Sequence, residues 1–577
     1  PHEDVVTDRY HSLTLAKAND FTAQVNLDNV TNDHDASIDA LGVATDAWIQ
    51  AKYVRDASSM VRTQAINAYT QNNVVGTASQ ALGVQANRLD VTTFNQSSVY
   101  VTSPAQLGLG DINAAGTTTE VVATAATNMS VLGTVTSPTR IKLTATAGSI
   151  QGSASGLLVA PDLIMIAGSG IGTTTPIATR IDRLAANGGT GGVSVLNDNG
   201  TKPLTIDTID GVNGVSGAGN ISIVTSDDLI INAPITDTTG AAIVTLTSGG
   251  AIIDGNLLSL NVSGGTLNAT AVDGIELDTS VTTLNATVSG TGPITIREAN
   301  GITLNNLLAA NGPISVTALG SITATSVVST TDSDSNDIFL EAKNGGNITV
   351  GTITAGAGVY GDVTLIAAGQ VDDDNNNSTK ITADALTMTA ANGIGGSGAN
   401  GTRSLDTTIN SLTATVSAAG ELNVDETNGL NVLSATTPNG NITLTAGGSM
   451  NVTTVAADTV NDTITLIAGG SITDANTDAA APNETNNLTA YDLAMAAGTG
   501  IGGSANPLEV KVSRMEAAGG SGGIYVIDLE GGLTIGGVTP NLGKPALTGL
   551  SATGGDIIVT ARRPLTANED IINSGLN

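Results

Sequence analysis

The chain has 577 residues and carries 20 lysines and arginines against 52 aspartates and glutamates, which gives a formal net charge of −32. This charge repels the phosphate backbones of nucleic acids and argues against DNA or RNA as a partner. Cys is absent, which excludes disulfides and thiolate metal sites, and no run of 18 apolar residues occurs, so we expect no membrane-spanning helix.

Residues 1–70 have the least regular pattern of the chain. The stretch from Ala47 to Tyr69 could be read as a helix, but Ile49 lies 101 residues before Ile150, a spacing close to the repeat described below. We therefore expect 1–70 to form less regular N-terminal rungs of the same structure as the rest. In that structure, strands would be joined by a loop that carries a helical turn.

A recurring stretch organises residues 71–577. Its copies are spaced by 96, 104, 119 and 107 residues, and loops can absorb such variation while the landmarks keep their phase. The copies end at Val75, Ile171, Ile275, Ile394 and Ile501, as in Leu386-Thr-Met-Thr-Ala-Ala-Asn-Gly-Ile394-Gly-Gly-Ser and Leu493-Ala-Met-Ala-Ala-Gly-Thr-Gly-Ile501-Gly-Gly-Ser. We expect long repeats over about 75–170, 171–274, 275–393 and 394–500, with a partial repeat at 501–577.

A shorter unit recurs inside each long repeat, as in Gly440-Asn-Ile-Thr-Leu-Thr-Ala-Gly-Gly-Ser-Met450 and Gly312-Pro-Ile-Ser-Val-Thr-Ala-Leu-Gly-Ser-Ile322. Apolar residues alternate with Thr, Ser or Asn, which is the periodicity of a strand with one buried face. One such strand cannot bury its apolar face alone, but copies stacked in parallel can. The pattern predicts an all-β fold, a right-handed parallel β-helix or β-solenoid, with corners at Gly.

The predicted solenoid is an elongated rod with irregular side loops. With about 20 to 25 residues per rung, the chain would make about 25 rungs and a rod on the order of 120 Å long. A propeller or a row of sandwich domains would also repeat, but both usually carry aromatic residues in each unit, whereas this chain is 2% aromatic with one Trp. The side loops are expected at the long polar insertions Thr330 to Asp337, Asp372 to Thr379 and Ala475 to Asn487.

Catalytic constellations are sparse. The three histidines, His2, His11 and His34, are all N-terminal, so nucleophilic triads and zinc sites are not expected along the rest of the chain. Asp372, Asp373 and Asp374 could supply the two carboxylates of a glycosidase, but no aromatic residue lies near them in sequence to stack on a sugar. We interpret these residues as a solvated acidic loop and assign no catalytic residue.

Binding motifs are equally weak. Asp332-Ser-Asp-Ser-Asn336-Asp337 alternates oxygen ligands as a calcium loop does, but the sixth position lacks Gly and Glu341 comes two places too early, so calcium remains an open alternative to a plain loop. Gly500-Ile-Gly-Gly503 recurs at other repeats without a following Lys, which favours corner geometry over a phosphate cradle. The sequons at Asn441 and Asn451 coincide with the strand repeat. We expect no cofactor and no metal site.

The repeated Gly-Asn-Ile-Thr-Leu-Thr-Ala-Gly-Gly-Ser units, with Gly-Ile-Gly-Gly punctuation and almost no aromatic residues, resemble the repeat regions of filamentous-haemagglutinin-like and other giant β-strand-repeat surface proteins of bacteria. The resemblance covers roughly residues 75–577 and carries no functional residue over. It implies a right-handed β-helical shaft, export to the cell surface, and a role in adhesion, cell contact or a fibrous coat. The secretion domain typical of haemagglutinin-like proteins is not recognisable in residues 1–70.

The leading hypothesis is a structural or adhesive extracellular surface fibre, or a segment of one, that acts as a stiff shaft and is not an enzyme. The alternatives are a subunit of an end-to-end polymerising filament or sheath, and a β-helical polysaccharide lyase or hydrolase. Expected partners are the chain itself, end to end or side to side, and glycans or proteins of a host, a neighbouring cell or a matrix. Because the chain begins at Pro1 without a signal peptide and ends at Asn577 within a repeat, we expect a processed chain or an excerpt.

Overall fold

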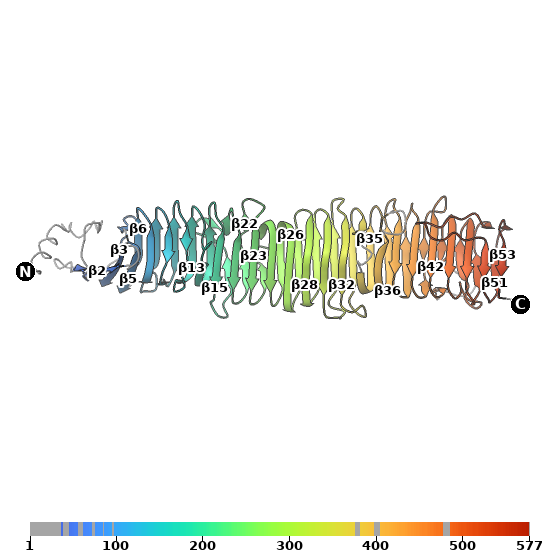
Figure 1. Cartoon of the computed structure of the whole chain (residues 1–577), viewed down its shortest axis with the longest axis horizontal. Helices are drawn as coiled ribbons and strands as arrows, with labels where there is room; N and C mark the ends of the chain where they lie inside the picture. Colours follow the sequence, from blue (N-terminus) through green and yellow to red (C-terminus); the bar gives the residue numbers. More distant parts are fainter. Residues whose placement is uncertain are drawn as a thin grey trace, which may run out of the picture. The chain divides into compact units, whose positions relative to one another are not determined.

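A computed structural model describes residues 36–38, 46–55, 62–71, 75–84, 86–94, 97–374, 381–396, 404–476 and 485–575. For residues 36–71 it describes the backbone alone. The chain divides into two compact units, Pro1–Gly265 and Thr266–Asn577. The described residues of both units form strands and turns and contain no helix (Figure 1).

The strands of the first unit are mostly short. They are β1 (Ala36–Ile38), β2 (Asp46–Arg55), β3 (Arg62–Gln71), β4 (Leu82–Gly83), β5 (Arg88–Phe94), β6 (Val99–Ser103), β7 (Leu107–Asn113), β8 (Glu120–Ala125), β9 (Met129–Val131), β10 (Thr134–Thr136), β11 (Arg140–Ala145), β12 (Ile150–Gln151), β13 (Leu157–Ala167), β14 (Ile177–Asn187), β15 (Val193–Asn197), β16 (Leu204–Ile206), β17 (Thr208–Ile209), β18 (Val212–Asn213), β19 (Val215–Gly217), β20 (Ile221–Thr225), β21 (Leu229–Ile231), β22 (Ile235–Asp237), β23 (Ile243–Ser248), β24 (Ile252–Asp254) and β25 (Val262–Ala271), in which the division falls.

The strands of the second unit have the same character. They are β26 (Ile275–Thr291), β27 (Ile294–Glu298), β28 (Ile302–Asn311), β29 (Ile314–Ala318), β30 (Ile322–Ser329), β31 (Ile338–Ala342), β32 (Ile348–Ala355), β33 (Val363–Ala367), β34 (Val371–Asp373), β35 (Ile381–Ala390), β36 (Leu405–Val416), β37 (Leu422–Glu426), β38 (Leu430–Thr436), β39 (Ile442–Ala446), β40 (Met450–Val452), β41 (Val455–Ala456), β42 (Thr463–Ala468), β43 (Ile472–Asp474), β44 (Leu488–Thr489), β45 (Asp492–Ala497), β46 (Leu508–Lys511), β47 (Arg514–Gly519), β48 (Ile524–Asp528), β49 (Leu533–Ile535), β50 (Leu550–Ala552), β51 (Ile557–Ala561), β52 (Leu565–Ala567) and β53 (Ile571–Asn573).

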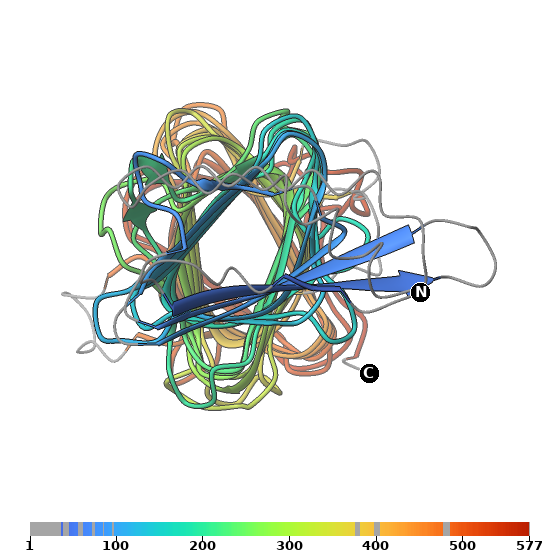
Figure 2. The same cartoon turned by 90° about the vertical axis from the view of Figure 1, so that its left-hand side faces the viewer.

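From β3 onward the strands of the coils pair in parallel with strands of the neighbouring coils, which confirms the predicted parallel β-helix. In the second unit, β27, β29, β31, β33 and β35 stack in register, so that Ile294, Ile314, Ile338, Val363 and Leu386 form one buried column. Figure 2 shows the backbone of the coils end-on, with successive coils stacked along the line of view. The solenoid has about 21 turns, fewer than the 25 expected, because side loops and N-terminal strands use residues without completing a turn.

The N-terminal strands pair differently from the coils. Strand β2 pairs antiparallel with β1 and with β3, and parallel stacking begins where β3 pairs with β5. The described part of the stretch considered for a helix thus lies in β2 and β3, while residues 56–61 between them and the three histidines fall outside the described residues.

The long repeat has a structural cause. Ile394 forms a parallel bridge to Val371, at the second strand position of the preceding coil, and another to Leu422, at the first strand position of the following coil. Ile501 does the same between Ile472 and Ile524. At each such junction, the column of second strands in the preceding coils therefore continues as the column of first strands in the following coils. The repeat of roughly 100 residues is a block of coils between two such junctions.

The first unit contains the same junction at Ile171, which bridges β12 and β15. The glycine after each junction residue has a positive φ, +64° at Gly172, +66° at Gly395 and +64° at Gly502. A Cβ at Gly172 would lie 2.2 Å from the Ser194 carbonyl oxygen, so the turn needs both the left-handed backbone and the missing side chain. This confirms that the Gly-rich stretches form corners.

The described residues include no helix with the length and apolarity that a membrane crossing requires.

Candidate functional site

Side loops leave the coils where a short strand ends in Asp. The strands concerned are β24, β34 and β43, whose last residues are Asp254, Asp373 and Asp474. The loops that follow are residues 255–261, 374–380 and 475–487, of which 375–380 and 477–484 lie outside the described residues. Most residues of two of the expected insertions, Asp372 to Thr379 and Ala475 to Asn487, fall outside the described residues.

A carboxylate and an amide clasp the base of the loop 255–261. Asp254 Oδ1 accepts the backbone N–H groups of Asn256 and Leu257, each at 3.0 Å, and the side-chain Nδ2 of Asn261 at 3.1 Å. Asn261 is fully buried, and its Nδ2 also donates to the Ile231 carbonyl oxygen at 3.1 Å. The loop is thus pinned at both ends while its middle projects from the coil.

Asp474 and Asn487 form an equivalent clasp in the second unit. Asn487 Nδ2 donates to Asp474 Oδ1 at 2.6 Å and to the Val452 carbonyl oxygen at 3.0 Å, and its Oδ1 accepts the Glu509 N–H at 2.9 Å. The same residue types at the same corner, with a longer loop between them, indicate a general device for attaching side loops to the coil.

Two leucine side chains at the tip of the loop 255–261 are exposed to solvent. The side chain of Leu257 is 76% exposed and that of Leu258 is 93% exposed. Leu257 also has a φ of +66°, a conformation that costs a non-glycine residue free energy and persists only where the surroundings hold it. The clasp supplies that constraint, and the result is a fixed apolar tip on the first unit.

A hairpin flap, residues 207–214, covers part of the outer surface of the first unit. Strands β17 and β18 pair antiparallel across the turn residues Asp210 and Gly211, which have φ values of +50° and +80°. Positive φ at both central residues is the type I′ geometry that Asp-Gly favours. The sequence analysis missed this hairpin, although Asp210-Gly211 between two apolar residues is its signal.

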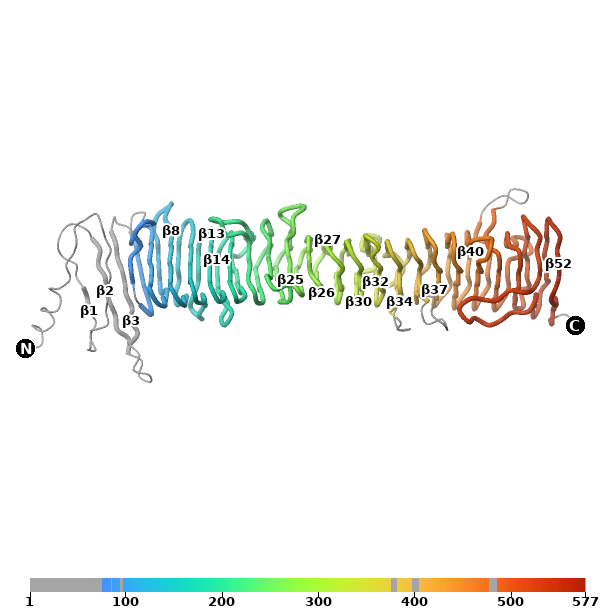
Figure 3. Tube along the Cα trace, turned by 90° about the horizontal axis from the view of Figure 1, so that it is seen from above, coloured from blue at the N-terminus to red at the C-terminus, as the bar shows by residue number. Residues whose placement is uncertain are grey.

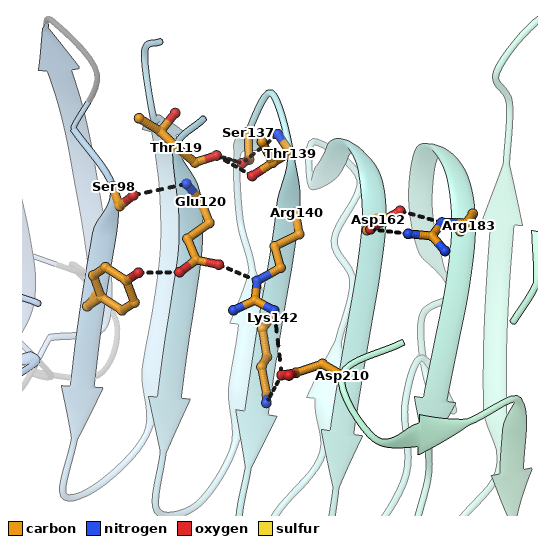
Figure 4. A network of polar contacts seen from close by, with 11 residues as sticks. Ser98, Thr119, Glu120, Ser137, Thr139, Arg140, Lys142, Asp162, Arg183 and Asp210 are labelled. Atoms are coloured by element: carbon orange, nitrogen blue, oxygen red, sulfur yellow. Dashed lines mark hydrogen bonds and ion pairs between the residues drawn. The ribbon is translucent and has the colours of Figure 1, made fainter. Parts of the chain in front are cut away.

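Apolar packing and ion pairs hold the flap. Ile209 packs on Ile164 and Ala185, which point outward from β13 and β14 and are fully buried. At the flap tip, Asp210 pairs with Lys142 and lies 3.7 Å from Nη1 of Arg140 (Figure 4). The Lys142 ammonium lowers the pKa of the Asp210 carboxyl.

Further ion pairs and hydrogen bonds link charged side chains on neighbouring strands of the first unit. Arg140 also pairs with Glu120, which accepts a hydrogen bond from the Tyr100 hydroxyl (Figure 4). Arg183 forms two hydrogen bonds to Asp162, at 2.8 and 2.6 Å, and a third to Asp207 at the base of the flap at 3.3 Å. These partly exposed pairs orient the flap more than they stabilise it.

The acidic triplet considered for catalysis does not share a face. Asp372 and Asp373 are successive residues of β34, so their side chains leave opposite faces of the strand. Asp373 is buried at the corner, Asp372 is half-buried and Asp374 is exposed. Two carboxylates directed to opposite faces cannot flank one glycosidic bond, so Asp373 cannot act as the partner of Asp372 in such a pair.

In the segment considered for calcium binding, two aspartate side chains accept hydrogen bonds from backbone N–H groups of the chain. Asp332 Oδ1 accepts the N–H groups of Tyr360 and Gly361, at 3.0 and 3.3 Å, and Asp337 Oδ1 accepts the Asp362 N–H at 3.0 Å. Among the described residues, no group of three or more His, Asp or Glu side chains is arranged to hold a metal ion. Glu341 lies on β31, beside Lys343, with Oε2 and Nζ 3.2 Å apart.

The two sequon asparagines belong to side-chain ladders along the stack. Asn441 Oδ1 accepts the Thr463 N–H at 2.8 Å, and Asn451 Nδ2 donates to Asn431 Oδ1 at 2.7 Å. Their positions follow from the strand repeat, as expected.

An open groove of about 490 Å³ lies at a corner of the second unit. It is formed where three successive coils turn and is lined by Val416, Ser417, Thr436, Thr437, Pro438, Ala456, Ala457, Asp458 and Thr459. Hydroxyl groups and one carboxylate beside small apolar side chains suit a polar ligand more than an apolar one. Nothing in the sequence signalled this groove, because its lining comes from residues 417, 437 and 458, which only coiling brings together.

Two exposed features of the described residues could contact other molecules: the leucine tip and the groove. Comparison with known proteins adds no assignment, since no protein-family model, no curated protein and no solved structure matches this chain.

Proposed function

We propose that the chain is a structural or adhesive extracellular surface fibre, or a segment of one, in which the stacked coils act as a stiff shaft. The observation that carries this proposal is the unbroken in-register column of buried aliphatic residues in the second unit, from Ile294 to Leu386. Each coil is tied to the next by parallel backbone hydrogen bonds and by this core, so bending would break both. A mechanical role needs such continuity and needs no reactive group.

The surface composition supports exposure to a solvent outside the cell. With 12% charged residues and a net charge of −32, the proposed fibre would stay soluble and repel its neighbours through Asp and Glu on a surface otherwise rich in Thr, Ser and Asn. Location can be tested by labelling intact producing cells with an antibody against the chain. Signal only after lysis would contradict the proposal.

Adhesion requires a contact surface, and the groove at Asp458 is our candidate for polar glycans. The test is a glycan array probed with the whole chain and with Asp458→Asn, with Asp182→Asn, a partly exposed carboxylate of the first unit, as the matched control. Binding that Asp458→Asn weakens and Asp182→Asn preserves would support the groove. Equal loss in both variants would indicate a general charge effect, and no binding at all would leave a purely structural fibre.

End-to-end assembly is the second candidate, favoured by one observation. Strands β51, β52 and β53 pair with the preceding coil only, and Leu565, Ile571 and Ile572 on them are about half exposed. Unpaired strand edges with apolar side chains pair readily with another coil. Electron microscopy at rising concentration should show particle length increasing, and Ile572→Lys should keep particles at unit length. Unit-length particles at every concentration would leave the shaft as the function.

A further inference from the structure

A second covering segment, which we call the strap, lies on the outer face of the second unit. The strap comprises residues 536–549, between β49 and β50. Asn541 at its middle donates two hydrogen bonds to residues far away in the sequence: its backbone N–H donates to Thr465 Oγ1 at 3.0 Å, and its Nδ2 donates to Thr443 Oγ1 at 3.1 Å. The strap therefore runs back over coils that precede it, as the red tube in Figure 3 shows.

The face beneath the strap is buried although it points away from the core. Its residues are Thr443, Thr465, Ala494 and Glu516, which follow one another in register on β39, β42, β45 and β47 and are 1 to 2% exposed. The equivalent strands β33, β35 and β36 carry Thr364, Thr387 and Thr413, and there Thr387 is exposed. The strap accounts for the burial of the first set, since Asn541 donates to both Thr465 and Thr443, whereas Thr364 and Thr413 are half-buried.

Two glutamates hold the ends of the strap. Glu516 Oε1 accepts the Val538 N–H at 2.8 Å. Glu569, in the turn between β52 and β53, accepts the N–H groups of both Gly537 and Gly549, at 3.1 and 2.7 Å. Because Gly537 and Val538 are consecutive residues, the carboxyl groups of Glu569 and Glu516 that accept their N–H groups lie close together under the base of the strap.

We propose that the strap is a proton-operated cover: it is locked when Glu516 is protonated and donates to Glu569, and it is released when Glu516 ionises and the two carboxylates repel each other. The Oε2 atom of Glu516 accepts no hydrogen bond from a side chain or backbone donor and is buried, which is where the shared proton would sit. Two carboxylates in contact cannot both ionise without cost.

The charges around Glu516 favour this behaviour. Burial raises the pKa of Glu516, and Glu569 raises it further against the opposing hydrogen bond from Val538. Arg514 on β47 donates two hydrogen bonds to Asp492 on β45, at 2.7 and 2.5 Å, and its electrostatic interaction with Glu516 is weaker than its interaction with Asp492. The strap's own Lys544 interacts with Asp425, on β37. Release would expose the small, polar strip of Thr443, Thr465 and Ala494 for contact.

The absence of Cys from the chain allows a direct test. A single Thr465→Cys reports the covered strip and a single Thr387→Cys reports the bare equivalent, so the ratio of their labelling rates by a maleimide corrects for the titration of the thiol itself. Between about pH 8 and pH 5 the Thr465→Cys to Thr387→Cys ratio should fall on the order of tenfold. A ratio that does not change with pH would overturn the proposal.

Two substitutions with the same change of charge should act in opposite directions. In Glu516→Gln the amide can still accept from Val538 and donate to Glu569, so position 465 should stay protected at both pH values. In Glu569→Gln one of the two glycine N–H groups loses its acceptor, so position 465 should label faster at both pH values. If both variants behave alike, net charge and not the carboxyl pair controls the strap. The wild-type pH profile decides the question if either variant fails to fold.

Discussion

Ile164 on β13 and Ile209 on the flap bury each other on the outer face of the first unit. The copies of this stretch in the second unit have Thr387 and Ala494 in place of Ile164. Thr387 is exposed, while Ala494 lies under the strap. The residue type at this outward position thus depends on whether a covering segment lies over it. The residue is apolar or small where a segment covers it, and it is Thr where the face is exposed to solvent.

Removing the flap's apolar anchor should loosen the flap. Ile209→Ala should cost about 2 kcal/mol, because a buried aliphatic side chain is lost from a cluster of few members. The measurement is native-state hydrogen exchange at Gly214, whose N–H donates to the Asp207 carbonyl oxygen. Leu258→Ala, at a position that is 93% exposed, is the control and should change stability by less than about 0.5 kcal/mol. Equal effects would show that the flap cluster contributes nothing.

The junction glycines should not tolerate a side chain. Gly172→Ala introduces both a strained φ and a contact of 2.2 Å with the Ser194 carbonyl oxygen, whereas Gly200, with a φ of +70°, has nothing within 4 Å of its added Cβ. Gly200→Ala should cost about 1 kcal/mol from backbone strain alone, and Gly172→Ala about 1–3 kcal/mol more. Urea unfolding followed by circular dichroism measures both. Similar losses would mean that the corner relaxes around the Cβ.

Breaking a loop clasp should free the loop. Asn261→Ala removes one donor each from Asp254 Oδ1 and from the Ile231 carbonyl oxygen, both of which keep backbone donors, so the cost should be that of lost hydrogen bonds, about 1 kcal/mol. Limited proteolysis should then cut within residues 255–260 faster than in the wild type. Asn305→Ala, which removes an exposed contact with Asn285, is the matched control and should leave the cleavage rate unchanged.

Acid should stabilise the second unit. Burial raises the pKa of Glu298 and of Glu426, although each carboxylate accepts hydrogen bonds from a Thr hydroxyl and from backbone N–H groups. A carboxyl with a raised folded-state pKa binds more protons in the folded state. Its favourable contribution is therefore complete below the unfolded pKa, about 4.3 for Glu, and declines as pH rises through the folded pKa.

The first unit offers the internal comparison. Asn197 occupies the place of Glu298 and Glu426, with Oδ1 accepting from Thr179 Oγ1 and from the Ile181 N–H, each at 2.9 Å, and it does not titrate. Hydrogen bonds from Thr239 and the following backbone lower the pKa of Asp237 there, against the effect of burial. That contribution is present above the unfolded pKa of Asp and is lost as pH falls through the folded one. From about pH 7 to pH 5, hydrogen exchange corrected for intrinsic rates should show protection rising in the second unit relative to the first. The opposite trend would contradict the assignment.

Individual residues show which structural features could be predicted from the sequence. Leu386, Met388 and Ala390 were readable as one face of a strand, and all three are buried. The clasp at Asp254 and Asn261 was harder to find, because its partners are separated by a loop of variable length and no alternation marks them. The groove at Asp458 and the carboxyl pair Glu516 and Glu569 could not be found, since their residues meet only through the stacking of coils.

The sequence by itself determined the all-β parallel coil, the corners and the long repeat, because alternation and Gly act over a few neighbouring residues and then recur. Only the tertiary structure decided which outward faces are covered. The flap joins Ile209 to Ile164, 45 residues earlier, and the strap joins Asn541 to Thr443, 98 residues earlier. Which coil such a segment reaches depends on the rise and rotation of every turn between them, a sum of small displacements that no local pattern encodes.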